Sequence, residues 1–279
     1  MSWFCVAGSL ILSTAFLGIF AGSLTASLIS YLVDDQQLYA WGWRIAYIIG
    51  GVLGLAGIVL RLRSVESPSF LKAEPPQELP AKLVFLHHKK PLVLAMLFTS
   101  IMAISNYVLI AYVTTFLVKS EGFELHDVLI INLLALLLLT LLIPLMGLLS
   151  DRYGRKPIFV SGLVGIFVFI FPFFWLMLSK QWWYILTSQI LLSIILAPLN
   201  ATVPTIIAEM FPTPVRASGT AIGYNIGQAL FGGTIPIIAF TLIEITGAKL
   251  APAWYILLWS IVVLYAVRFF NEHVRDELT

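Results

Sequence analysis

The chain has 279 residues, of which 60% are hydrophobic and 11% are charged, with a formal net charge of +2. Soluble globular domains are apolar in only about 45–50% of their residues, so this composition excludes a water-soluble protein and indicates one embedded in a membrane. A single cysteine, Cys5, excludes a disulfide framework and a cysteine-based metal site.

Eight apolar runs, in chain order, approach or exceed the roughly 20 residues that a helix needs to cross a bilayer. They lie near 4–32, 43–60, 92–118, 128–149, 158–178, 183–207, 217–243 and 252–270. In lipid, backbone groups find no water to bond, so we expect each run to be a helix. The predicted fold class is therefore an all-α, polytopic membrane helix bundle.

The most highly charged turn is Gly147–Pro157, with the sequence GLLSDRYGRKP. It places Asp151, Arg152, Arg155 and Lys156 between two uncharged spans. Its excess of positive charge predicts a cytoplasmic position. With this turn inside, twelve of the sixteen Lys and Arg residues are cytoplasmic, and both chain termini are expected inside as well.

The longest connection, 61–90, holds six basic and three acidic residues and several prolines. It separates two spans from six and has the composition of a linker between helical units.

Four stretches resemble the major facilitator superfamily, and within it the metabolite:proton symporter branch that carries proline and betaine, dicarboxylates or shikimate. Gly147–Pro157 is similar to the loop signature G-x-L-x-D-R-x-G-R-[KR], and the other three stretches are Trp41–Arg44, Arg63–Phe70 and Ala208–Gly219. The resemblance implies proton-coupled symport of a small organic solute across the inner (cytoplasmic) membrane.

In that family the signature follows the second and eighth of twelve helices, whereas here it occurs once, after the fourth span. The resemblance therefore implies about 8 of the usual 12 transmembrane helices. Residues 1–60 would be the last two helices of the N-terminal bundle, 61–90 the cytoplasmic inter-bundle loop, and 91–279 the six-helix C-terminal bundle. Two alternatives stay open: a transporter whose N-terminal half is missing or supplied by a partner chain or oligomer, and a non-transporting remnant.

By resemblance, the signature turn is a latch that closes the cytoplasmic face. Asp151 and Gly154 are expected to begin the next helix, where a carboxylate suits the positive helix end. Arg152 and Arg155 are expected to reach Glu209, and Arg216 to pair with Asp151; the alternative is a loop that only fixes the topology. The predicted gating residues are Gly147, Asp151, Arg152, Gly154, Arg155, Lys156, Glu209 and Arg216.

No Asp, Glu, Lys or Arg lies clearly near the middle of a span, so the polar residues there are neutral. By position in the family's seventh helix, Asn106, Tyr107 and Tyr112 resemble half of a substrate cavity. The alternative is ordinary hydrogen bonding between helices. The cavity candidates are Asn106, Tyr107, Tyr112, Asn200, Tyr224 and Asn225.

Other chemistries find no support in the sequence. The four histidines lack zinc-site spacing, and neither a G-x-x-x-x-G-K-[ST] phosphate loop nor a nucleophile elbow occurs. We expect no enzyme, no cofactor, no metal and no nucleic-acid partner. The expected partners are a small organic solute, protons and the lipid bilayer.

Overall fold

The computed structural model describes residues 4–63 and 79–270. Most of the Arg63–Phe70 stretch, the centre of the 61–90 connection and both chain termini lie outside the described residues. Within them, eight helical segments are long and apolar enough to cross a membrane, which confirms the predicted helix bundle and number of spans.

Several spans consist of more than one helix. The first span is the single helix α1 (Phe4–Leu32). The second follows α2 (Asp35–Gln37) and consists of η1 (Leu38–Gly42) and α3 (Trp43–Leu62). After α5 (Pro80–His87), the third span consists of α6 (Lys89–Tyr107), η2 (Val108–Tyr112) and α7 (Val113–Glu121). The remaining five are α8 (Leu125–Tyr153), α9 (Arg155–Met177), α10 (Trp182–Glu209), α11 (Thr213–Gly227) with η3 (Gln228–Gly232) and α12 (Ile235–Thr246), and α13 (Ala251–Ala266) with the short η4 (Val267–Phe269).

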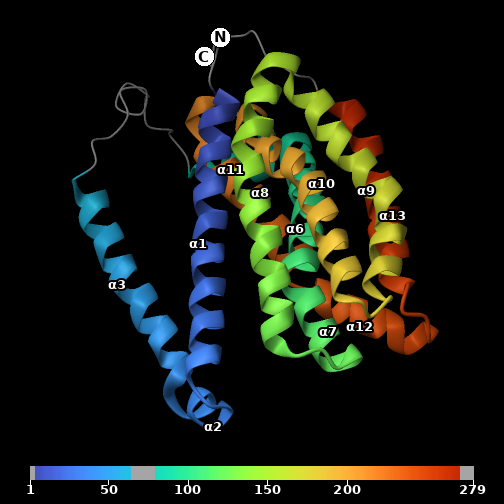
Figure 1. The fold of residues 1–279 in the computed structure, drawn as a ribbon. Helices are drawn as coiled ribbons and strands as arrows, with labels where there is room; N and C mark the ends of the chain where they lie inside the picture. Colours follow the sequence, from blue (N-terminus) through green and yellow to red (C-terminus); the bar gives the residue numbers. More distant parts are fainter. Residues whose placement is uncertain (1–3, 64–78, 271–279) are drawn as a thin grey trace.

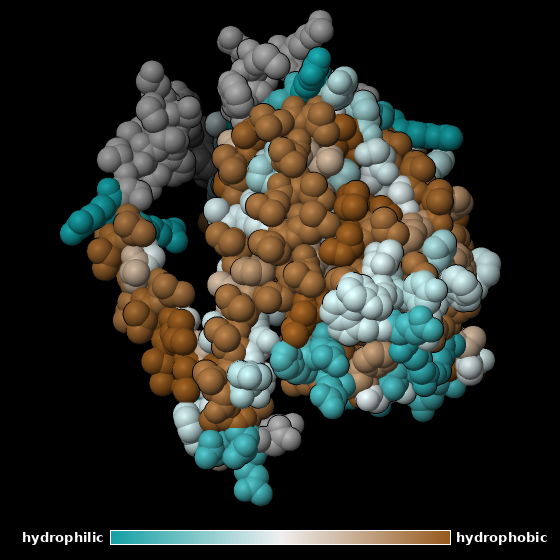
Figure 2. Space-filling view, viewed as in Figure 1, coloured by the Kyte–Doolittle hydropathy of each residue, from teal (hydrophilic) through white to brown (hydrophobic). Residues whose placement is uncertain are grey.

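Two spans form the centre of the bundle, α10 and the one that begins with α6. Each is largely buried, and α10 packs against α1, α6, α8 and α9. The face of the molecule seen in Figure 2 is a broad hydrophobic band, with hydrophilic side chains gathered toward its two ends. The apolar side chains on this face suit lipid, and exposed hydroxyls within the spans, such as those of Thr14, Thr25 and Thr187, donate to carbonyl oxygens of their own helix.

The first two spans differ in how they meet the bundle. α1 packs along α8 and α10, and the Ser13 hydroxyl donates to the Thr140 carbonyl oxygen over 2.9 Å. α3 buries no residue and lies on the far side of α1 from α8 (Figure 1). The division into units 1–60 and 91–279 stays a prediction, because the structure joins α1 closely to the second unit.

Two spans change to π-helical winding partway along, at η2 and at η3. A π-turn inserts an extra residue into a helical turn, and such turns often mark functional sites. The sequence patterns predicted continuous helices here. The two π-helical segments turn out to border the same cavity.

Candidate functional site

The signature turn begins with a close helix contact at Gly147. A Cβ atom on Gly147 would lie 2.2 Å from Ser9 Oγ and 3.2 Å from the Cys5 carbonyl oxygen, so no larger residue fits without movement. The glycine thus lets α1 approach the last turns of α8. Gly154, farther along the turn, has φ = 101°, a left-handed conformation that favours glycine and separates α8 from α9.

Asp151 binds the start of α1. Its Oδ1 accepts the Cys5 backbone N–H over 3.1 Å, and its Oδ2 accepts the Val6 backbone N–H over 3.0 Å. A carboxylate is favourable there, because the first N–H groups of a helix have no partner within the helix and carry partial positive charge. The expectation that Asp151 begins the next helix is therefore wrong: it belongs to the last turn of α8 and stabilises α1.

The cations of the turn have separate partners. Arg155 Nη2 lies 2.8 Å from Glu209 Oε1, and only 2% and 8% of these side chains are exposed, so one predicted ion pair is present. The predicted contact between Arg152 and Glu209, both described by the structure, is absent: Arg152 Cζ lies 5.4 Å from the centroid of the Tyr153 ring. Lys156 Nζ donates to the Phe270 carbonyl oxygen over 3.1 Å, which ties the turn to the end of the last span.

The predicted Arg216–Asp151 pair is wrong. Arg216 Nε donates to the Phe211 carbonyl oxygen over 3.1 Å, while both carboxylate oxygens of Asp151 accept from the backbone of α1. Sequence reasoning missed this arrangement because the partner of Asp151 is the backbone of a helix 145 residues away, and a backbone group leaves no mark in the sequence.

A cavity of about 470 Å³, here called the central chamber, lies between α1, α10 and the two spans that contain η2 and η3. It is lined by Leu12, Ala15, Phe16, Ile19, Asn106, Tyr107, Ile110, Ala111, Asn200, Tyr224, Asn225 and Gln228. Five of the six predicted cavity residues are thus brought together. Its described lining residues carry no formal charge.

Two hydrogen-bonded pairs organise the polar side of the central chamber. Asn106 Nδ2 donates to Asn200 Oδ1 over 2.8 Å, and Asn200 Nδ2 donates back to Asn106 Oδ1 over 3.0 Å, which links α6 to α10. Gln228 Nε2 donates to the Tyr224 hydroxyl oxygen over 3.0 Å, so the Tyr224 hydroxyl proton stays available to a bound molecule.

Tyr112 is the cavity candidate that lies elsewhere. Its side chain is fully buried, with ring centroids 5.6 Å from Phe116, 5.9 Å from Phe174 and 5.6 Å from Phe240. It follows Asn106 and Tyr107 in the same span, at the end of the π-helical segment η2, and contributes to the aromatic core instead of the chamber. Tyr107, in contrast, is 37% exposed and lines the central chamber.

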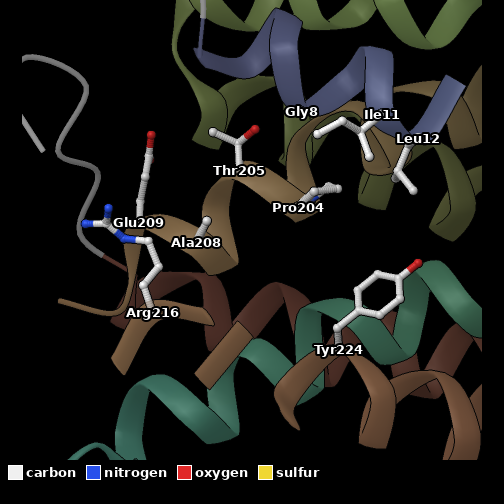
Figure 3. A pocket seen from close by; sticks show the side chains of 9 residues that line it. All are labelled: Gly8, Ile11, Leu12, Pro204, Thr205, Ala208, Glu209, Arg216 and Tyr224. Carbon is white, nitrogen blue, oxygen red and sulfur yellow. The ribbon is translucent and has the colours of Figure 1, made fainter. Parts of the chain in front are cut away.

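A second cavity, of about 460 Å³, adjoins the first toward the signature turn and is here called the signature-end chamber. Its lining residues are Gly8, Ile11, Leu12, Pro204, Thr205, Ala208, Glu209, Arg216 and Tyr224. Figure 3 shows Glu209 and Arg216 at one end of it, with Leu12 and Tyr224 at the opposite end. Leu12 and Tyr224 line both chambers and so mark the boundary between them.

The contribution of α1 to both chambers was not anticipated. Leu12 belongs to the lining of each, and Phe16 to that of the central chamber, yet both are ordinary apolar residues of a lipid-compatible helix. Only the tertiary contact of α1 with α10 identifies them.

Similarity to known proteins agrees with this architecture. A protein described as a proline/betaine transporter, from Staphylococcus haemolyticus, is 32% identical over 88% of this chain and 53% of its own length. The glycine betaine/proline/ectoine/pipecolic acid transporter OusA of Dickeya dadantii is 31% identical over 94% of this chain and 54% of its own. The ectoine/proline transporter ProP of Corynebacterium glutamicum is 27% identical over 95% and 56%.

The chain thus spans about half the length of the curated relatives it matches. These relatives are transporters by name, which agrees with the expectation that the chain is not an enzyme. The family model of the Major Facilitator Superfamily matches residues 130–277, from within α8 through the last span. That match covers more than half of the chain and contains the signature turn and the last four spans, so the chain belongs to the major facilitator superfamily.

Proposed function

We propose that this chain forms one wall of a pathway for a small zwitterionic solute of the proline or betaine type. The observation that carries the proposal is the central chamber, a neutral but polar cavity in the middle of an apolar bundle. Its volume lies within the roughly 300–1,000 Å³ of small-molecule sites. The names of the relatives support the same substrate class.

The lining of the central chamber suits a molecule with separated charges and no net charge. Tyr107 and Tyr224 offer aromatic faces, which attract quaternary or secondary ammonium groups. Asn225 and Gln228 carry amide N–H donors for a carboxylate. An anionic or cationic solute would need a compensating charge, and none is present among the described lining residues.

The signature-end chamber would be the way out of the central chamber. Leu12 and Tyr224 separate the two cavities, and Glu209, Arg155 and Arg216 stand where the second one approaches the signature turn. We propose that the predicted gating set (Gly147, Asp151, Arg152, Gly154, Arg155, Lys156, Glu209 and Arg216) holds α1 against α8 and α10 when this face is closed. Alternating access requires two helical units that rock around one site, so helices beyond those described would form the opposite wall.

Proton coupling, inner-membrane location and cytoplasmic termini are part of the proposal. The distribution of Lys and Arg supports the orientation, because the predicted topology assigns twelve of the sixteen to the side of the signature turn. The resemblance to the symporter branch supports the proton as coupling ion. Uptake that stops when a protonophore collapses the proton gradient is the expected result.

Binding to the purified chain tests the solute class directly. We expect saturable binding of labelled glycine betaine and proline, and no competition by an excess of a monoanion such as benzoate. Tyr224→Ala should weaken betaine binding about tenfold because it removes an aromatic face, whereas Tyr224→Phe keeps the ring and should retain binding. Tyr184→Ala, on the exposed outer end of α10, is the matched control.

Two results would overturn the proposal. One is equal binding by the Tyr224→Ala and Tyr184→Ala variants. The other is the absence of saturable zwitterion binding in a folded preparation, combined with the absence of uptake in cells that express the chain.

A further inference from the structure

A third cavity, of about 550 Å³, lies between α6 and α13 at the end of the bundle that carries the signature turn. It is lined by Lys89, Lys90, Val93, Leu94, Leu97, Val262, Tyr265, Ala266 and Phe269, and we call it the α6–α13 groove. None of these residues lines either chamber. The groove is therefore separate from the proposed solute pathway.

The walls of the groove face outward. Val93 is 53% exposed, and Val262, Tyr265 and Phe269 are similarly exposed, although all four are apolar or aromatic. In a membrane protein such a concave apolar wall is filled by lipid chains. Its volume is large enough to hold more than a single side chain of a neighbouring molecule.

Positive charge is concentrated at one end of this groove. Lys89 and Lys90 open α6, and Lys90 Nζ lies 5.9 Å from the centroid of the Phe269 ring. Arg268 Cζ lies 5.6 Å from the centroid of the Tyr265 ring, on the facing helix. The ion pairs found among the described residues include none of these three cations. A carboxylate is also missing from the described lining.

We propose that the α6–α13 groove binds an anionic phospholipid of the leaflet at this end of the bundle. The lipid phosphate would contact Lys89 and Lys90, next to the electropositive start of α6, and an acyl chain would lie against Val93, Leu97 and Val262. Cations at one end and apolar walls beyond them are complementary to an amphiphile with an anionic head. Basic pockets between transmembrane helices are known to select such head groups.

The inference extends beyond the proposed solute pathway and does not depend on it. It requires only that the chain spans a membrane, so a failure to bind betaine leaves it intact. The competing explanation is that the two lysines merely extend toward the headgroup layer, as long basic side chains at helix ends commonly do. That explanation predicts no difference between lipids of equal chain length.

The test compares two lipids with the same acyl chains on the delipidated full chain in a neutral detergent. Dioleoyl phosphatidylglycerol and dioleoyl phosphatidylcholine are titrated, and bound lipid is counted by native mass spectrometry. We expect one phosphatidylglycerol to be retained in preference to phosphatidylcholine. Lys89→Gln/Lys90→Gln should reduce this preference about 30-fold, since each cation near an anionic lipid surface contributes about fivefold.

Matched variants separate the groove from general surface charge. Arg61→Gln/Arg63→Gln removes two cations at the end of α3, away from the groove, and should leave the preference unchanged. Val93→Phe keeps both lysines but fills the groove, and should also lose the bound lipid. Because Val93 faces outward, this variant should fold normally.

The proposal is overturned if phosphatidylcholine is retained as well as phosphatidylglycerol. It is equally overturned if the two double variants lose the lipid to the same extent, or if Val93→Phe retains it. Gel filtration and far-UV circular dichroism of each variant establish that lipid loss is not a loss of fold.

Discussion

The two ends of the helix bundle each hold one carboxylate with a buried side chain against a cation from another part of the chain, but they differ in how much water reaches the cations. At the signature end, both partners of the Arg155–Glu209 pair are almost fully buried. At the opposite end, the side chain of Glu121 is 0% exposed, while its partners Lys180 and Lys249 are 60% and 48% exposed. The carboxylate–cation pair is therefore shielded from water at the signature end, whereas the cations are solvated at the opposite end.

The difference matters because a buried charge loses its hydration and depends on its partner. Removing one member of a buried pair leaves an uncompensated charge and costs about 3–5 kcal/mol, whereas pairs exposed to water contribute about 0.2–1 kcal/mol. We therefore expect the contacts between helices at the signature end to be stable and to break together. At the opposite end, here called the outer end, the ion pairs of Glu121 should be weakened more readily by substitution of one lysine and by salt.

The largest expected effect is that of Arg155→Leu, which removes the cation that lies 2.8 Å from the buried carboxylate of Glu209. We expect a loss of about 3–5 kcal/mol in the free energy of unfolding, measured by chemical denaturation in detergent. The double variant Arg155→Leu/Glu209→Leu should be much more stable than the single one, because it removes both charges. Equal stability of the single and double variants would contradict the conclusion that Arg155 and Glu209 behave as a buried ion pair, unlike the pairs at the other end.

Gly147→Ala should come next, with a loss of about 1–3 kcal/mol from overpacking. The new methyl group would meet Ser9 Oγ, so α1 must move away from α8. Cys5 is buried beside this contact, and its rate of modification by a thiol-specific dye reports the movement. Gly147→Ala/Ser9→Gly should slow the modification of Cys5 again. A double variant as reactive as the single one would mean that the clash with Ser9 is not what moves α1.

Asp151→Asn should be milder, at about 1 kcal/mol, because one amide oxygen can still accept an N–H from the start of α1. The loss of negative charge beside that helix end adds to the effect. Modification of Cys5, whose own N–H binds Asp151, should become faster. Asp127→Asn, at an exposed acid in the first turn of α8, removes the same charge far from Cys5 and should leave the rate of Cys5 modification unchanged. An equal change in that rate for both variants would contradict the role of Asp151.

The contrast between the two ends also shows what the sequence could predict. The spans follow from apolar length alone, and Arg155–Glu209 was predicted because a recognisable motif carries each partner. The Glu121 cluster was not predicted, since Glu121 ends α7, its two lysine partners stand in two separate connections, and none of the three belongs to a recognised motif. The π-helical turns at the central chamber, and the backbone partner of Asp151, depend likewise on tertiary contacts that local patterns do not specify.

The smallest expected effect is that of Lys249→Gln, and the same holds for Lys180→Gln. Each should cost about 0.2–1 kcal/mol, and the loss should shrink at high salt because the lysines are solvated. The double variant should lose more than the sum of the two, because Glu121 would then be buried with neither cation. Lys119→Gln, at an exposed lysine of α7, the helix that ends at Glu121, controls for the general effect of removing a positive charge.

The double-mutant cycle formed by these variants decides whether the interactions of Lys180 and Lys249 with Glu121 have the energies of solvent-exposed ion pairs, as the exposure of the two lysines suggests. Coupling between the lysines that survives high salt would mean that the buried carboxylate governs the cluster, and the two ends would then be alike. Purely additive, salt-sensitive losses would mean that each lysine interacts with Glu121 through water. In that case the end of α7 and the two connections that carry Lys180 and Lys249 are joined only weakly, and the end opposite the signature turn is the one free to move.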